Sequence, residues 1–412
     1  MAVPTINATI NFSTGPSFAQ ALILDEGILG TNILSDSTAV IVDVSNQINR
    51  IETKRGRNAL IDEFQTGTLT LRIIDQNGDF NPENPASPYY TYLTPMKKVQ
   101  ITATYNSVTY PIFSGFITSY VTTYPREAED VTYTTIQAVD ALRLAQNAQI
   151  STVAGATAGE LSGARINDIL DQISWPATMR DIDAGLTTVQ ADPGTTRTAL
   201  AALVTVTQSE YGAFYVDASG SFVFQDRAVT AGSVGGTPTV FADDGTGIDY
   251  ADVAWILNDV LVFNKATITR VGGSAQVATN QDSIDKYFLH SYFLDGLLME
   301  SDAVALDYAQ AYVASRAETS IRCDAITLDL YTPNYTTGVV AALNLDFFDP
   351  ITIKTTQPGG SVLSKTLQIF GVSMAITPNS WKTTFTTLEP VIDAFILDNS
   401  IYGTLGYNVL SY

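Results

Sequence analysis

Alternating apolar and polar residues run through much of the chain and predict a protein built mainly of β-strands. Over Thr68–Ile74, apolar residues at every second position alternate with threonine and arginine, the period of a strand with one buried face. Further strands are predicted over 98–124, 130–140 and most of 255–390. Abundant Thr, Val, Ile, Tyr and Phe, which pack well in strands, favour the same structure.

Helical periodicity interrupts the strands in two regions. Between 162 and 175, isoleucine and leucine recur on one helix face, and Ser162 is placed to act as the N-cap. A second helix is predicted from about Thr196 to Gly212, followed by a hairpin. A third helix is predicted over 301–318, inside the later run of strands. The expected fold class is therefore mainly β with α+β insertions.

These patterns divide the 412-residue chain into five segments. They are an N-terminal segment (1–35), a first β-rich domain (36–149), a small α+β insertion domain (150–232), a second β-rich domain with the inserted helix (233–390) and a C-terminal tail (391–412). The length is sufficient for several domains, each with its own core.

The two β-rich domains resemble each other along their sequences. An overlay of 93–115 on 343–371 places Leu93 on Leu343, Ile101 on Ile351 and Gly115 on Gly371. Each region continues with a strand, a polar loop and a Thr-rich strand. The alternatives are an internal duplication and the general likeness of any two β-meanders, and we favour duplication. Three copies of a duplicated chain would place six similar β units around one axis, so they could dock on a six-fold partner.

Acidic residues outnumber basic ones strongly, giving a net charge of -21 and a pI near 4.2. Such a surface has little capacity to bind phosphate backbones and is repelled by anionic membranes. No uncharged apolar stretch reaches about 20 residues, and the N-terminus lacks the features of a signal peptide. We therefore expect no specific nucleic-acid binding and no membrane insertion. The acidity serves either solubility or a passage that does not hold DNA.

Cysteine and histidine are each present once, as Cys323 and His290. This composition excludes a disulfide framework and a thiolate metal cluster, and it leaves few routes to acid–base catalysis. No carboxylate motif points to glycoside hydrolysis. We expect no enzymatic activity and no cofactor.

The stretch 73–95 carries Asp75, Asn77 and Asp79, which alternate as calcium ligands do. A calcium loop of the EF-hand type starting at Asp75 would need glycine and glutamate where Phe80 and Ala86 stand, so the match fails. We favour a structural connector with self-capping turns and keep a loop-bound cation as a weak alternative.

Two groups of side chains are candidates for protein interfaces. Prolines hold 82–88 extended, so Tyr89, Tyr90 and Tyr92 can pack against a neighbouring surface. Lys54, Arg55 and Arg57 form the densest basic group in the chain. We expect salt bridges from them to an acidic neighbouring subunit or ring; the alternative is a solvated loop.

An ordered series of motifs resembles the N-terminal region of minor tail proteins of long-tailed, siphovirus-type bacteriophages. The series is Gly56-Arg57, Phe64 to Thr68, the turn with Asp75, Gly78, Phe80, Pro82 and Asn84, then Ser87 to Tyr90, Leu93 and Pro95. The second half also fits, over 258–266, 282–288, the helix with Ala309 and Arg316, 345–353 and 369–390. The likeness covers about residues 40 to 405 and extends to the trimeric baseplate hub.

The resemblance implies that both β-rich domains are tube-like β-barrels and that the protein forms a homotrimeric hub at the virion tail tip. It implies as partners a hexameric distal tail protein, the C-terminus of the tape-measure protein and a tail-tip fibre or receptor-binding protein. The hub would adapt the hexameric tube to a three-fold tip and line the passage for DNA and tape measure, which we expect to be acidic. Alternatives are the hexameric distal tail protein itself, or a receptor-binding or cell-wall-degrading component of the tip.

Overall fold

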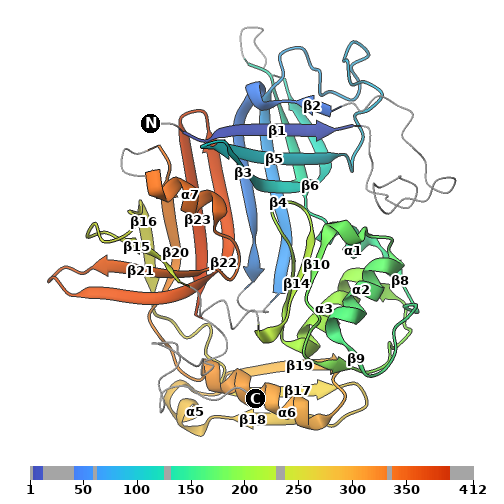
Figure 1. Ribbon diagram of the computed structural model, residues 1–412, viewed down its shortest axis with the longest axis vertical. Helices are drawn as coiled ribbons and strands as arrows, with labels where there is room; N and C mark the ends of the chain where they lie inside the picture. Colours follow the sequence, from blue (N-terminus) through green and yellow to red (C-terminus); the bar gives the residue numbers. More distant parts are fainter. Residues whose placement is uncertain are drawn as a thin grey trace.

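A curved sheet containing 13 of the described strands dominates the computed structural model (Figure 1). The structure describes residues 3–12, 41–58, 63–124, 131–228, 237–331 and 336–389. Small α+β units are attached to the sheet, so the predicted class, mainly β with α+β insertions, is confirmed. The predicted C-terminal tail, 391–412, lies outside the described residues.

Two successive parts of the chain build this sheet. The first unit contains β1 (Thr5–Asn11), β2 (Ile41–Asp43), the short helix η1 (Ser45–Gln47), β3 (Ile48–Asn58), β4 (Glu63–Ile74), β5 (Lys98–Tyr105), β6 (Val108–Thr123) and β7 (Tyr133–Val139). The second unit contains β15 (Thr239–Ala242), β16 (Asp252–Ile256), β20 (Arg322–Asp329), α7 (Thr336–Asn344), β21 (Pro350–Thr356), β22 (Val362–Thr377) and β23 (Ser380–Leu388). Helix α7 was not predicted.

The two units share one strand order. The first runs β3-β4-β7-β6-β5-β1 and the second runs β16-β20-β23-β22-β21-β15, with corresponding strands in the same chain order. Both carry a register shift at the same place, after Ile117 in β6 and after Ile369 in β22. A non-glycine residue with positive φ precedes the matching strands, Met96 at 67° and Phe348 at 66°. They differ in β15, which is parallel to β21, whereas β1 is antiparallel to β5.

The alignment of the two units differs from the one read from the sequence. Because Ile117 and Ile369 occupy the same bulge, Ser119 corresponds to Gly371, not Gly115. Strands β5 and β21 pair with β6 and β22, and their registers align Val99, and not Ile101, with Ile351. The sequence overlay was therefore wrong by four and by two residues. Side chains alternate with period two, so an even shift keeps every buried position buried and the hydrophobic pattern cannot detect it.

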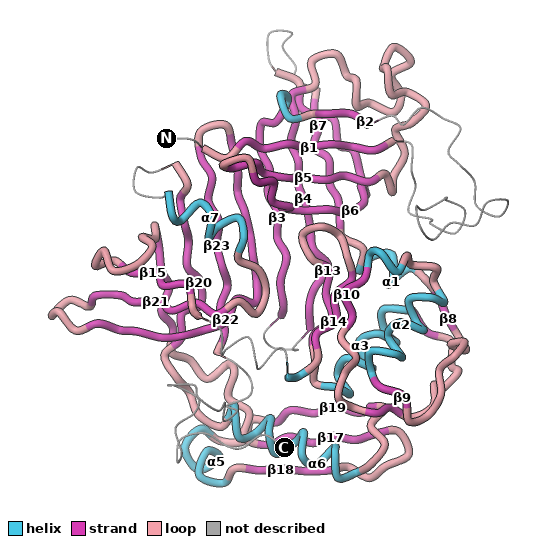
Figure 2. The backbone as a smooth tube through the Cα atoms, viewed as in Figure 1, coloured by secondary structure: helices cyan, strands magenta, loops and turns pink. Residues whose placement is uncertain are grey.

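The units are joined by direct strand pairing, which we call the internal joint. Residues Gly371–Ile376 of β22 pair antiparallel with Ile51–Gly56 of β3 (Figure 2). The two predicted barrels are thus two units of one sheet, and no strand pairing among the described residues closes either unit. β1, predicted in a separate N-terminal segment, pairs with β5 along its whole length and belongs to the first unit.

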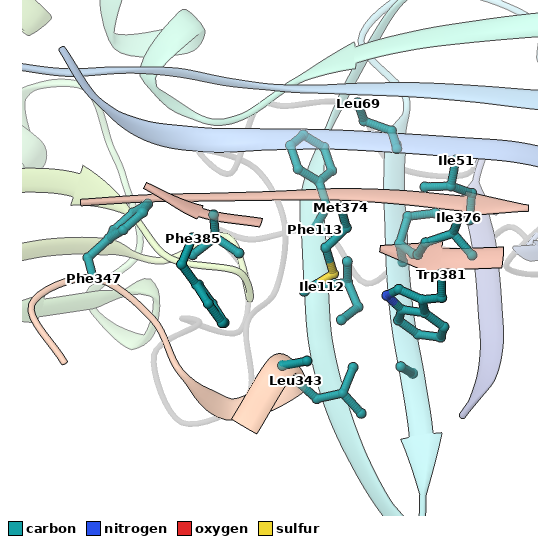
Figure 3. Packing of buried hydrophobic residues seen from close by; sticks show 14 of the residues in the cluster. Ile51, Leu69, Ile112, Phe113, Leu343, Phe347, Met374, Ile376, Trp381 and Phe385 are labelled. Carbon is teal, nitrogen blue, oxygen red and sulfur yellow. The ribbon is translucent and has the colours of Figure 1, made fainter. Parts of the chain in front are cut away.

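One hydrophobic core extends across the internal joint. Ile51 of β3, Ile376 of β22 and Trp381 of β23 lie together, and Leu343 of α7 belongs to the same core (Figure 3). Ile51 and Trp381 are almost fully buried, and burial of one such side chain contributes about 1.5–3 kcal/mol. Since residues of both units make up this core, we expect the two units to fold as one body.

An α+β unit over 142–225 overlaps the predicted insertion domain (150–232) and contributes most of a second hydrophobic core. It consists of α1 (Leu142–Asn147), β8 (Gln149–Ile150), β9 (Glu160–Leu161), α2 (Ser162–Gln172), η2 (Ala177–Met179), β10 (Arg180–Ile182), β11 (Thr188–Val189), β12 (Arg197–Thr198), α3 (Ala199–Glu210), β13 (Ala213–Val216) and β14 (Phe222–Gln225). Ser162 is not the N-cap of α2; its hydroxyl donates to Glu210 Oε2 at 2.9 Å.

Residues inside the predicted second barrel form a further α+β unit. It contains β17 (Lys265–Arg270), β18 (Gln276–Thr279), α5 (Gln281–Tyr287), β19 (Ser291–Leu297) and α6 (Asp302–Arg316). Helix α6 was predicted, but it packs on this separate three-stranded sheet and not on the second unit. The sequence did not indicate this separate sheet, because β17 pairs in parallel with β19, which is not its neighbour along the chain. None of the described helices has the length and apolar character needed to cross a bilayer.

Candidate assembly surfaces

Strand β3 carries the predicted basic group and lies at the internal joint. Arg55 is buried, with 7% of its surface exposed, and its Nη2 donates to Asp346 Oδ1 and Oδ2 at 3.0 and 3.1 Å. Its guanidinium lies 4.9 Å from the ring centre of Phe347. Arg55 therefore connects the two units of one chain, and it is not available for the predicted salt bridge to another subunit.

The other two basic residues do not join Arg55 in a cluster. Lys54 is exposed on the opposite face of β3, because successive strand residues alternate between faces. The guanidinium of Arg57 lies 5.2 Å from the ring centre of Phe370 in the second unit. Of the three, only Lys54 is exposed on the sheet surface, where it remains a candidate for an interface.

Asp140, a residue that sequence reasoning missed, is buried next to this joint. Its carboxylate accepts hydrogen bonds from the N–H groups of Gly67 at 2.6 Å and Leu142 at 3.0 Å. Burial raises the pKa of Asp140 to about 7, against the opposing effects of these hydrogen bonds and of Arg55. A side chain at Gly67 would collide with the carboxylate, since its Cβ would lie 2.7 Å from Asp140 Oδ2.

The loop with Asp75, Asn77 and Asp79 is organised by hydrogen bonds to one carboxylate. Asp75 Oδ1 accepts from the N–H of Asp79 at 2.7 Å, and Oδ2 accepts from the N–H of Phe80 at 3.1 Å and from Thr134 Oγ1 at 2.8 Å. This is the geometry of a turn cap. Among the described residues, no group of three acidic, histidine or cysteine side chains is placed to hold a metal ion.

The same loop takes the place of a helix in the duplicated fold. It joins β4 to β5, as α7 joins β20 to β21, and it inserts Phe80 and Leu93 into the core. Tyr89 packs between Phe12 and Phe80, with ring centres 5.4 and 5.3 Å away, and burial raises its pKa. Tyr89 thus stabilises the loop, whereas Tyr90 and Tyr92 are 45% and 40% exposed and can contact another molecule.

The second half of β6 and the outer side of β16 are strand edges without a backbone partner among the described residues. Beyond Ile117, β6 continues past the end of β5 and pairs only with β7. Strand β16 pairs only with β20. Large apolar side chains are exposed along these edges: Val121 and Tyr124 at β6 (49% and 60%) and Leu257 just after β16 (61%). Unpaired edges of this kind are templates for a further strand.

The side of the sheet opposite the core, here called the polar face, continues across both units. One row of paired residues contains Asp329, Lys382, Ala375, Glu52, Thr70, Gln137 and Ser119. The next contains Asp252, Thr327, Thr384, Ser373, Lys54 and Thr68. These rows are rich in hydroxyl groups and hold three acidic and two basic side chains. These two rows are therefore close to neutral, although the chain carries -21, and the adjacent row places Arg50 opposite Arg72.

Solved structures of tail proteins share this architecture. A tail protein from Neisseria meningitidis MC58 aligns with a TM-score of 0.58 and 9% identity, over 95% of this chain and 98% of that one. The 43 kDa tail protein of prophage MuSo2 from Shewanella oneidensis aligns with a TM-score of 0.52 and 11% identity, over 85% of this chain and 94% of that one. The predicted resemblance to phage tail proteins is confirmed at the level of the fold.

Neither the protein-family models nor the curated proteins give a match to the sequence.

Proposed function

We propose that the chain is a structural, non-enzymatic protein of a phage tail, which assembles as a homotrimeric hub at the tail tip. The observation that carries this proposal is the duplication: two units with the same strand order and the same bulge, set side by side in one sheet. The fold shared with two tail proteins supports the assignment to a tail.

Three copies of a chain with two equal units provide six similar surfaces around one axis. A six-fold tube protein can then contact a three-fold ring through nearly equivalent surfaces. The proposed partners are accordingly a hexameric distal tail protein, the C-terminus of the tape-measure protein and a tail-tip fibre or receptor-binding protein. Tyr90 and Tyr92, which are exposed on the β4–β5 loop, are candidate contacts to one of them.

The polar face is the surface that suits the lining of a central passage. Core residues and α7 cover the other side of the sheet, whereas the polar face carries short threonine and serine side chains. The acidic lining expected from the composition is not supported by this face, which is nearly neutral. Its two hydroxyl-rich rows carry three acidic and two basic side chains, and Arg50 beside Arg72 adds two cations. These cations are few for retaining a polyanion, so we expect DNA to pass without being held.

The mass of the purified chain in solution tests this proposal. We expect a trimer of about 133 kDa, three times the 44.3 kDa chain, in native mass spectrometry. Sedimentation in moderate salt serves as the control, since interfaces built on strand pairing and apolar contact resist screening. A hexamer would favour the distal tail protein, and a monomer at all concentrations would contradict the hub.

A further inference from the structure

The two free strand edges are the counterparts of the edges that are joined inside the chain. In the duplication, β22 corresponds to β6 and β3 corresponds to β16. β22 and β3 pair with each other at the internal joint. The corresponding part of β6 and the whole outer edge of β16 have no backbone partner among the described residues. The chain thus carries both halves of a second joint.

The paired residues of the internal joint define the register of this second joint. The shared bulge places 371–376 of β22 on 119–124 of β6. On the other side, Ile51 pairs with Leu71 and Val253 pairs with Ile326, and these partners occupy equivalent positions beside β7 and β23. Val253 and Ala254 therefore correspond to Ile51 and Glu52. The register then shifts because β20 carries an extra residue opposite Ala254 and Trp255, and counting along β16 itself places 255–257 on 53–55.

Residues at the internal joint are far more buried than the corresponding residues at the two free edges. Ile376 is 4% exposed at the internal joint, whereas its counterpart Tyr124 is 60% exposed. Arg55 is 7% exposed, whereas its counterpart Leu257 is 61% exposed. Large apolar side chains thus stand uncovered at the positions that the internal joint buries, which marks an interaction surface.

We propose that β6 of one copy pairs antiparallel with β16 of the next copy, in the register of the internal joint. This inference rests on the proposed homotrimer and adds the residues that form its interface. Tyr124 then lies opposite Val253, Thr123 opposite Ala254 and Val121 opposite Ile256 of the neighbouring copy. The core face of this joint receives Tyr120, Trp255 and Leu257, and the polar face continues from one copy to the next.

The two edges do not pair with each other within the described chain. β6 and β16 lie seven strand positions apart, about 34 Å along the sheet. A contact between two different surfaces is head-to-tail, and it closes into a ring when the rotation per copy divides a full turn. Three copies with two units each then give alternating internal and intermolecular joints around a continuous sheet.

A cysteine pair tests the register directly. In the variant Thr123→Cys with Ala254→Cys, two exposed positions face each other across copies, within the Cα separation that a disulfide requires. Mild oxidation should convert most of the protein to a covalent trimer on a non-reducing gel. The control, Thr123→Cys with Ile256→Cys, is displaced by two residues, a diagonal distance of about 7–8 Å, and should cross-link at least tenfold less.

A second variant tests the interface without a cross-link. Leu257→Lys should convert the trimer to a monomer with unchanged circular dichroism, since a charged lysine at an edge opposes strand pairing. Val362→Lys, at a similarly exposed position (52%), should leave the trimer intact.

The outcomes separate this inference from the proposed function. A wild-type trimer that gives neither the 123–254 cross-link nor dissociation by Leu257→Lys would overturn this joint and leave the homotrimer standing. Equal cross-linking of both cysteine pairs would overturn the register. A monomeric wild-type protein would overturn the homotrimer, and with it the joint.

Discussion

Single buried groups control how the two units meet. Arg55 reaches from β3 to Asp346 of the second unit, and Asp140 lies next to it with its carboxylate held by two backbone N–H groups. The absence of a side chain at Gly67 lets the Asp140 carboxylate lie this close to the backbone, since any larger residue at 67 would displace the carboxylate. These contacts place ionisable groups inside the molecule, where charge is costly, so pH should affect stability here.

Asp140 should make the protein less stable as pH rises. The pKa of its carboxyl is raised in the fold, from 3.8 to about 7, so the folded chain holds a proton that the unfolded chain has lost. Stability from this group therefore falls as pH rises from about 4 to 7. The side chain of the variant Asp140→Asn cannot ionise and removes this pH dependence. Between pH 5 and pH 8, the unfolding free energy of the wild type should therefore fall by on the order of 1–3 kcal/mol relative to that of the variant.

Urea denaturation at the two pH values measures this difference. Asp259→Asn, a change at an exposed aspartate, is the control and should follow the wild-type pH dependence. Parallel pH dependence of the wild type and Asp140→Asn would contradict the prediction.

Asp75 organises its loop by accepting three hydrogen bonds. Asp75→Ala leaves those donors without their acceptor, and we expect a loss of about 1–3 kcal/mol of unfolding free energy. Asp79→Ala should cost much less, because its backbone N–H remains in place. Thermal unfolding with and without calcium checks both points: a turn cap predicts no calcium effect, whereas a calcium-dependent rise in Tm would favour the cation alternative.

At the scale of elements, the internal joint depends on close approach of two strands. Gly56 and Gly371 are paired across it, and a Cβ on Gly56 would lie 2.8 Å from Gly371 Cα and 3.0 Å from the carbonyl oxygen of Phe370. Both contacts are with backbone atoms, which cannot move aside as a flexible side chain can. The glycine in the Gly56-Arg57 motif is thus explained by packing at the joint.

Gly56→Ala should therefore destabilise the joint, at a cost of about 1–3 kcal/mol for overpacking. Ser373→Ala, on the polar face of the same joint, is the matched control and should be nearly neutral. Hydrogen exchange should show faster opening of β3 and β22 in the glycine variant. Wild-type exchange and unfolding free energy in Gly56→Ala would refute the steric explanation.

At the scale of the whole molecule, one sheet spans two equivalent units and carries two complementary free edges, on β16 and on the second half of β6. The same geometry that joins the units inside the chain provides the proposed contact between copies. The distribution of charge also belongs to this scale, because the polar face is close to neutral while the chain as a whole is strongly acidic. Most of the net negative charge therefore belongs to residues outside the two rows of the polar face, where it favours solubility.

The sequence by itself determined the local structure, because periodicity is a local property. Alternation over Thr68–Ile74 placed β4, helical spacing placed α2, α3 and α6, and the motif series identified the fold of a tail protein. Similar strand patterns also indicated the duplication. Each of these features is encoded in residues that are neighbours along the chain.

The tertiary structure alone decided how these elements combine. In the structure, the alignment of the two units differs from the sequence overlay by two and by four residues. Arg55 forms an ion pair inside the chain, and α6 packs on a separate sheet. Strand partners, buried ion pairs and free edges depend on residues far apart in the sequence, such as Arg55 and Asp346. A period of two leaves all even registers equivalent, so only packing in three dimensions selects one.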